Sequence, residues 1–257
     1  MTTTPQGPPK VLTMTEQDTL RITSRFRGPA RSGNGGYVSG RLGAALAAVS
    51  PAGTVPRVRL RLPPPLELEL ELKVSAAGAQ LCGPDGLVAE ALPVGSSVLD
   101  DATVDPVDPD RARAAEAAYR GLVAHPFPTC FVCGPDNAEG LRLRPGGLGD
   151  GRTACTWIPD RELAAADGLI DATFLWAALD CPGGWTTDLE GRPSVLGELT
   201  VGVDARPAAG EPCVVMGRLL GEDGRKTVTA TTLYDADGRV LARARQIWIA
   251  VDPAAFC

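Results

Sequence analysis

The chain has 257 residues, of which 44% are hydrophobic and 22% are charged, so it can form one or two packed domains and is not a disordered protein. Its formal net charge of -6 leaves no cationic surplus to neutralise phosphates, so a nucleic-acid partner is not expected. The single histidine, His125, excludes any metal site or acid–base pair that needs two histidines from one chain.

The first part of the chain predicts an irregular arm followed by a small domain. Residues 1–19 are polar and contain several prolines. They lack the apolar core of a signal peptide, and no apolar run reaches about 18 residues, so we expect a cytoplasmic protein without a membrane span. Residues 20–96 form the predicted N-terminal domain, with one helix over 36–49 and strands over 20–27, 55–62, 66–74, 79–82 and 86–94.

The clearest periodic pattern lies in residues 66–74, where leucines alternate with charged residues. This period of two predicts a strand with one buried face and one solvated face. The preceding strand, 55–62, alternates in the same way with arginines. Opposite charges suggest that the two strands pair, but the three prolines at 63–65 suit a tight hairpin turn poorly. We therefore do not expect these two strands to be neighbours.

The second part of the chain repeats the order of the first. Residues 97–125 are acidic at their start and predict a linker with a helix from about 110 to 122. Residues 126–257 form the predicted C-terminal domain, with a helix over 171–181 that Pro182 should end, and strands over 141–144, 153–158, 194–205, 212–221, 225–234 and 239–251. Each half thus combines one helix with an antiparallel sheet, which indicates an α+β fold built as a fused dimer.

Cysteines are seven in number and scattered along the chain, apart from the C-x-x-C formed by Cys130 and Cys133. A zinc site needs two further ligands, and the sequence offers none at a matching spacing. A redox C-x-x-C belongs to a thioredoxin-like context, which is absent here. We therefore expect a structural role for this pair and no bound metal.

Several segments together resemble hotdog-fold acyl-CoA thioesterases. The resemblance lies in the stretches 33–40 (GNGGYVSG), 130–137 (CFVCGPDN), 178–185 (ALDCPGGW), 195–207 (VLGELTVGVDARP) and 224–244. It implies a tandem, or double, hotdog with two antiparallel sheets, each wrapped around a central helix. It further implies that the strands near 55–62 and 194–205 meet in a pseudo-dimer within the chain, and that an acyl-CoA or another acyl thioester binds between the helices.

Thioesterases of the phenylacetyl-CoA type have a polar residue and two glycines at the helix start, and an acid nine positions after the polar residue. The first half matches the helix start with Asn34, Gly35 and Gly36, but nine positions after Asn34 stands Gly43. In the second half the acid is present, as Asp180.

The second half lacks the glycines, because Ala172 and Thr173 follow its polar residue, Asp171. Because a hotdog site combines the glycines of one unit with the acid of the other, the resemblance implies one complete site between residues 34–36 and Asp180. The mirror site, with Gly43, should be inactive.

The resemblance implies that the amides of Gly35 and Gly36 hold the oxyanion and that Asp180 is the base or nucleophile, without a cofactor. Simpler interpretations remain open. The glycines can form a tight turn, and Asn34 can cap the helix rather than contact substrate. Tyr37 and the other helix aromatic, Trp176, can line an acyl pocket or belong to the core.

Other functions are also compatible with this fold. A non-catalytic acyl-CoA or acyl-carrier binding module would use the same helix start and cleft. Hotdog dehydratases and hydratases generally use a histidine, and His125 stands outside both predicted helices. Hydrolysis of an acyl-CoA or related thioester is therefore the leading hypothesis, and the sequence leaves the acyl group and any further pairing into a homodimer open.

Overall fold

The computed structural model describes residues 18–252 and 254. The predicted arm, residues 1–19, lies outside the described residues except for Asp18 and Thr19, which already belong to the first strand. Within the described ranges, none of the helices is both long and apolar enough to cross a membrane.

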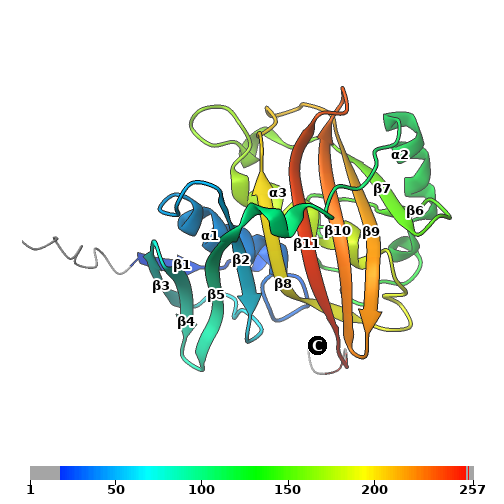
Figure 1. The fold of residues 1–257 in the computed structure, drawn as a ribbon. Coiled ribbons are helices and arrows are strands. Elements are labelled where there is room, and N and C mark those ends of the chain that lie inside the picture. Colours follow the sequence, from blue (N-terminus) through cyan, green and yellow to red (C-terminus); the bar gives the residue numbers. More distant parts are fainter. Residues whose placement is uncertain (1–17, 253, 255–257) are drawn as a thin grey trace, which may run out of the picture.

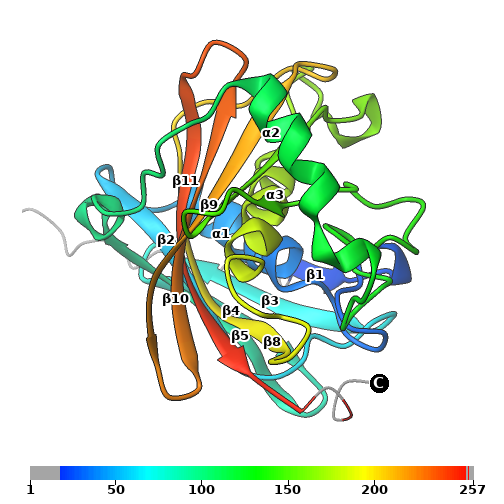
Figure 2. The same ribbon diagram turned by 90° about the vertical axis from the view of Figure 1, so that its right-hand side faces the viewer.

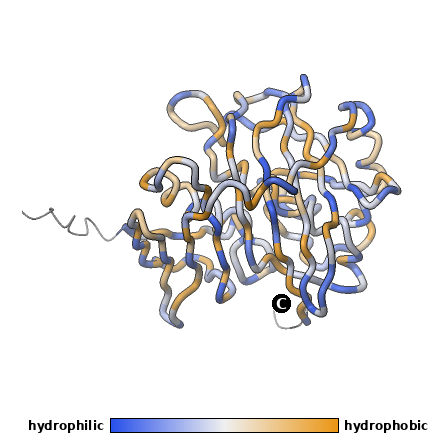
Figure 3. Tube along the Cα trace, in the orientation of Figure 1, coloured by the Kyte–Doolittle hydropathy of each residue, from blue (hydrophilic) through white to orange (hydrophobic). Residues whose placement is uncertain are grey.

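Within the described part of the chain, an antiparallel sheet of 11 strands forms the body of the molecule (Figure 1). Hydrophobic and hydrophilic residues alternate along many of its strands, as expected when one face covers a core (Figure 3). The spatial order is β1-β3-β4-β5-β2-β8-β11-β10-β9-β7-β6. The strands are β1 (Asp18–Arg21), β2 (Thr54–Leu60), β3 (Glu69–Ser75), β4 (Gly78–Gly83), β5 (Gly86–Gly95), β6 (Gly146–Gly147), β7 (Arg152–Trp157), β8 (Ser194–Val203), β9 (Cys213–Asp223), β10 (Lys226–Asp235) and β11 (Val240–Ala250).

The two halves of the sheet are joined where β2 pairs with β8. The register places Val58 opposite Leu199, and Arg59 at this junction forms a 2.5 Å ion pair with Glu198. The expectation that these two strands meet is confirmed. The expectation of two sheets is not, because backbone pairing across this junction makes the sheet continuous. As expected from the prolines, β2 and β3 are not neighbours.

Two helices of 13 residues, α1 (Gly35–Ala47) and α3 (Ala172–Gly184), lie side by side on the inner face of the curved sheet (Figure 2). They run antiparallel and very close together: a Cβ added at Gly36 would lie 2.5 Å from Asp180 Cβ, and one at Gly40 would lie 2.8 Å from Trp176 Cβ. Small residues on α1 therefore allow the contact that brings the start of α1 to the last turns of α3.

The first part of the linker, up to its helix, crosses the outer face of the second half of the sheet (Figure 1), whereas Tyr119 packs in the core on the side of α3. Tyr234 and Thr232 on β10 bond to the backbone of Val104 and fix this path. Its helix α2 (Pro109–Ala115) is shorter than predicted and is followed by two 3-10 turns. The chain leaves the helix because Tyr119 is extended and its hydroxyl donates to Cys133 O at 2.8 Å.

Three predicted strands differ from the structure because local backbone geometry interrupts them. Glu67 has φ 61°, and its carboxylate accepts from Ser24 N at 2.6 Å, so β3 starts only at Glu69 and Leu68 is 45% exposed. The strand predicted over 20–27 gives way to a 3-10 turn at Ser24–Phe26. Arg142 has φ 58°, so residues 141–144 form no strand.

Pro182 does not end α3, contrary to the prediction, because side chains from the sheet bond to the carbonyls of this stretch. Gln246 on β11 donates to Leu179 O and, at 3.0 Å, to Asp180 O. Thr153 on β7 donates to Pro182 O at 2.7 Å. The helix therefore continues through the proline to Gly184, with its last turns bonded to side chains of the sheet.

Candidate active site at the helix contact

Asn34 caps α1 and also reaches across to α3. Its Oδ1 accepts from Tyr37 N at 2.8 Å, which satisfies one of the free N–H groups at the helix start. Its Nδ2 donates to Asp180 Oδ2 at 2.9 Å. The two interpretations of Asn34 are thus compatible, because one end of the amide caps the helix and the other contacts the candidate acid.

Asp180 is held in place by the start of α1. In addition to Asn34, the N–H of Gly36 donates to the same Oδ2 atom at 3.0 Å. A side chain at Gly36 would occupy the position of Asp180, so this contact requires glycine. The structure therefore brings Asn34, Gly36 and Asp180 together.

Burial gives Asp180 unusual acid–base properties. The residue is 2% exposed, and Oδ1 has no hydrogen-bond partner among the described residues. Burial, together with the nearby charge of Cys130, raises the pKa of Asp180 to about 7, although the hydrogen bonds from Gly36 and Asn34 act in the opposite direction. Such a buried carboxyl at the end of a helix is unusual for a purely structural residue.

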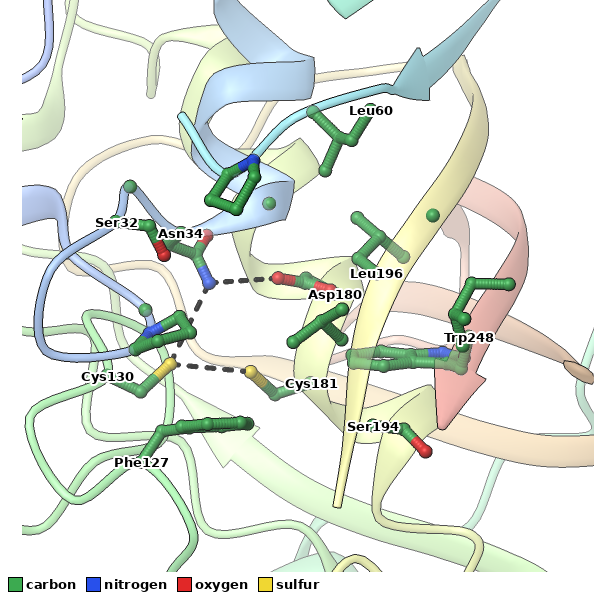
Figure 4. Close-up of a pocket in the computed structure, with 18 of the residues that line it drawn as sticks. Ser32, Asn34, Leu60, Phe127, Cys130, Asp180, Cys181, Ser194, Leu196 and Trp248 are labelled. Atoms are coloured by element: carbon green, nitrogen blue, oxygen red, sulfur yellow. Dashed lines mark hydrogen bonds between the residues drawn. The ribbon is translucent and has the colours of Figure 1, made fainter. Parts of the chain in front are cut away.

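A cavity of about 230 Å³ opens beside Asn34 and Asp180 (Figure 4). Gly35, Asn34 and Asp180 line it, whereas Gly36 does not. Among the described residues, the N–H of Gly35 has no hydrogen-bond acceptor, so this donor can reach a ligand while the N–H of Gly36 already holds Asp180. Much of the remaining wall is apolar and includes Leu60, Phe127, Trp185, Leu189, Leu196 and Trp248.

The other two predicted site residues lie outside this cavity. Tyr37 is buried and its ring stacks on Phe26 at a centroid distance of 3.9 Å. Trp176 is also buried, and its indole lies against Gly43, where an added Cβ would be 2.5 Å from the ring. Both aromatics are therefore core residues here, and Trp176 fills the position where the mirror site was expected.

Three thiols meet at the floor of the cavity. The Sγ atoms of Cys130, Cys133 and Cys181 lie within 4.8 Å of one another, and all three residues line the cavity. The sequence suggested that the C-x-x-C pair had no further ligand, but folding brings Cys181 from the end of α3 to it. Contacts with the other two thiols hold the pKa of Cys130 well below its usual range, while burial raises the pKa values of Cys133 and Cys181.

His125 contacts the same cluster. Its Nδ1 accepts from Phe127 N at 2.9 Å, which leaves the proton of the neutral ring on Nε2, 3.3 Å from Cys133 Sγ. Burial lowers the pKa of His125, in agreement with a neutral ring. The single histidine thus lies in the cavity wall, although it belongs to neither helix.

Sequence reasoning missed Cys181, Gln246 and the apolar walls from β8 and β11. Cys181 directly follows the candidate acid, but nothing in the spacing connects it with a pair some fifty residues earlier. Gln246 lies on the buried face of β11, between Ala244 and Trp248, and it is 0% exposed. A lone amide in such a strand was the available signal for a buried hydrogen-bonding role.

Comparisons with known proteins identify the fold. No protein-family model and no curated protein matches this sequence. Among solved structures, the tesB protein MAP1729c of Mycobacterium avium subs paratuberculosis is similar with a TM-score of 0.61 and 12% identity, over 91% of this chain and 92% of that one. A protein of Novosphingobium aromaticivorans DSM 12444, described provisionally as a thioesterase, is similar with a TM-score of 0.60 and 17% identity, over 94% and 99% of the two chains.

These similarities extend over nearly the whole chain, and the structural neighbours are thioesterase-superfamily hotdog proteins. At such low identities they establish the fold and leave the activity to the chemistry of the site.

Proposed function

We propose that the protein hydrolyses an acyl-CoA or a related acyl thioester at the contact between α1 and α3. One observation carries this proposal: a buried carboxyl, Asp180, is aimed by Asn34 and Gly36 beside a cavity that also exposes the start of a helix. The shared fold with thioesterase-superfamily proteins supports the same reaction class.

In the proposed reaction, Asp180 acts as the general base. It removes a proton from water while the water oxygen attacks the thioester carbonyl. The N–H of Gly35, at the positive end of α1, donates to the developing oxyanion. The carbon–sulfur bond then breaks, and the thiolate leaves with the proton that Asp180 had taken. Gly36, predicted as a second oxyanion donor, is reassigned to positioning Asp180, because its N–H is already bonded to that carboxylate.

The proposed architecture is a double hotdog, in which residues 20–96 and 126–257 are the two units and 97–125 is the linker. Each unit contributes one helix and one half of the sheet, and the junction between β2 and β8 corresponds to a dimer interface within one chain. Only one of the two sites then works, since Trp176 occupies the mirror position against Gly43. A further homodimer of such chains is compatible with this arrangement.

The test is an assay for free thiol with short, long and aromatic acyl-CoAs. Wild-type protein should release thiol from at least one of them, and Asp180→Asn should slow the release by about 100-fold or more. A matched control is Asp171→Asn, because Asp171 caps α3 by accepting from Thr173 N at 2.8 Å and asparagine can do the same. Tight binding of acyl-CoA without turnover would instead establish the alternative, a non-catalytic acyl-CoA or acyl-carrier binding protein.

A further inference from the structure

The thiol cluster under the cavity has the dimensions of a metal site. Cys130 Sγ lies 3.7 Å from Cys181 Sγ, and Cys133 Sγ completes a group whose members are all within 4.8 Å of one another. Zinc–thiolate bonds of about 2.3 Å at tetrahedral angles place sulfur atoms about 3.8 Å apart. One separation already has this value, and the others need to shorten by at most about 1 Å.

The surroundings of the sulfur atoms present hydrogen-bond donors. Asn34 Nδ2 donates to Cys130 Sγ at 3.7 Å, and Trp185 Nε1 donates to Cys133 Sγ at 3.5 Å (Figure 4 shows the first of these contacts). His125 directs its protonated Nε2 at Cys133 Sγ. N–H groups around sulfur stabilise thiolates, and outer partners of this kind accompany metal ligands.

We propose that Cys130, Cys133 and Cys181 bind one Zn²⁺ ion through three thiolates, with the fourth coordination position facing the cavity. Thiolates are soft ligands that select zinc over magnesium or calcium. When the ion binds, the three thiols lose their protons to solvent. Three H⁺ leave and one Zn²⁺ enters, so the site gains one net negative charge, which the surrounding N–H donors can stabilise. No fourth histidine, cysteine or carboxylate atom of the described residues belongs to the group, so water or a ligand fills the open position.

The ion would also stabilise the geometry of the proposed active site. Cys181 directly follows Asp180 on α3, and Cys130 contacts the same Asn34 amide that holds Asp180. One ion would thus tie the loop at 130–133 to the end of α3 and to the start of α1. Metal binding itself is measured without turnover, so its failure and the failure of the proposed hydrolysis are separate results.

The experiment uses the full-length, tag-free chain, fully reduced, stripped of metal with a chelator and then titrated with Zn²⁺ or Co²⁺. We expect one ion per chain by elemental analysis. The Co²⁺ form should show a thiolate-to-cobalt charge-transfer band in the near ultraviolet and the strong visible bands of tetrahedral cobalt. Binding of less than one ion per chain by the folded wild type, or cobalt spectra without the thiolate band, would overturn the proposal.

Two serine variants separate the cluster from the other cysteines. Cys181→Ser should weaken Zn²⁺ binding by more than about 100-fold, since even outer partners of metal ligands are worth roughly 10–100-fold. Cys213→Ser is the matched control, because Cys213 is buried in β9 away from the group and should leave the affinity unchanged. Equal affinities of the two variants would contradict the assignment, and circular dichroism verifies that each variant is folded.

Discussion

Gln246 fixes the turn of α3 that carries Asp180, so Gln246→Leu should lower both stability and hydrolysis. Its amide nitrogen donates to Leu179 O and Asp180 O, and its Oε1 accepts from Thr229 Oγ1. All of these contacts are buried, and Pro182 already weakens the helix at this point. Leucine has nearly the same volume, so the substitution removes hydrogen bonds without opening a large cavity.

The expected loss follows from these contacts. Three buried hydrogen bonds at roughly 1 kcal/mol each amount to about 3 kcal/mol of the free energy of unfolding. That is a large fraction of the 5–15 kcal/mol typical of a folded domain. Freed carbonyls near Pro182 should also let the last turns of α3 shift, which moves Asp180 away from Asn34 and lowers kcat more than it raises KM.

Urea unfolding followed by circular dichroism measures the loss of stability, and thiol release from an acyl-CoA measures the fall in kcat. The matched control is Gln80→Leu on β4, where the glutamine is exposed and stability should change little. If Gln246→Leu is as stable and as active as the Gln80 variant, the idea that sheet side chains hold the helix through its proline is wrong.

Three further predictions follow from the helix contact, the metal site and the sheet junction. Gly36→Ala should destabilise the protein by about 1–3 kcal/mol, because the new Cβ would lie 2.5 Å from Asp180 Cβ. Gly35→Ala should lower the free energy of unfolding by less, because its Cβ would meet flexible leucine side chains. Equal losses for the two variants in urea unfolding would refute the tight contact at Gly36. Adding saturating Zn²⁺ to stripped protein should raise Tm, measured by calorimetry, and an unchanged Tm would argue against the metal site. Arg59→Met should lower the free energy of unfolding by less than about 1 kcal/mol, since the ion pair with Glu198 is partly solvated. A much larger coupling energy between Arg59 and Glu198 in a double-mutant cycle would contradict this.

The general plan of the fold was predictable because local sequence patterns, alternation in strands and helical spacing in helices, determine most of its elements. Alternation in the strands of the second half and the helical spacing of both long helices survive in the structure nearly at the expected bounds. The junction of β2 and β8 was expected only from the family resemblance, since no local pattern encodes which strands meet. The start of β3 and the whole strand predicted over 141–144 were wrong, because Glu67 and Arg142 adopt a positive φ that their side-chain types do not predict.

The candidate site was predictable in part for a related reason. Asn34, Gly36 and Asp180 were connected by a family pattern, and the structure places them in contact. The thiol cluster and the core positions of Tyr37 and Trp176 depend instead on how closely α1 and α3 approach. That distance is set by glycines on one helix facing side chains on the other, which a single sequence does not reveal.

The central claim is that Asp180 performs the chemistry, and the steady-state kinetics of Asp180→Asn test it most directly. Asparagine fits the same space and can still accept from Asn34 and Gly36, so binding of the acyl-CoA should persist. We expect kcat to fall by about 100-fold or more with little change in KM, while Asp171→Asn keeps wild-type kinetics. A wild-type kcat for the Asp180 variant would remove this residue from the mechanism and contradict the proposed site.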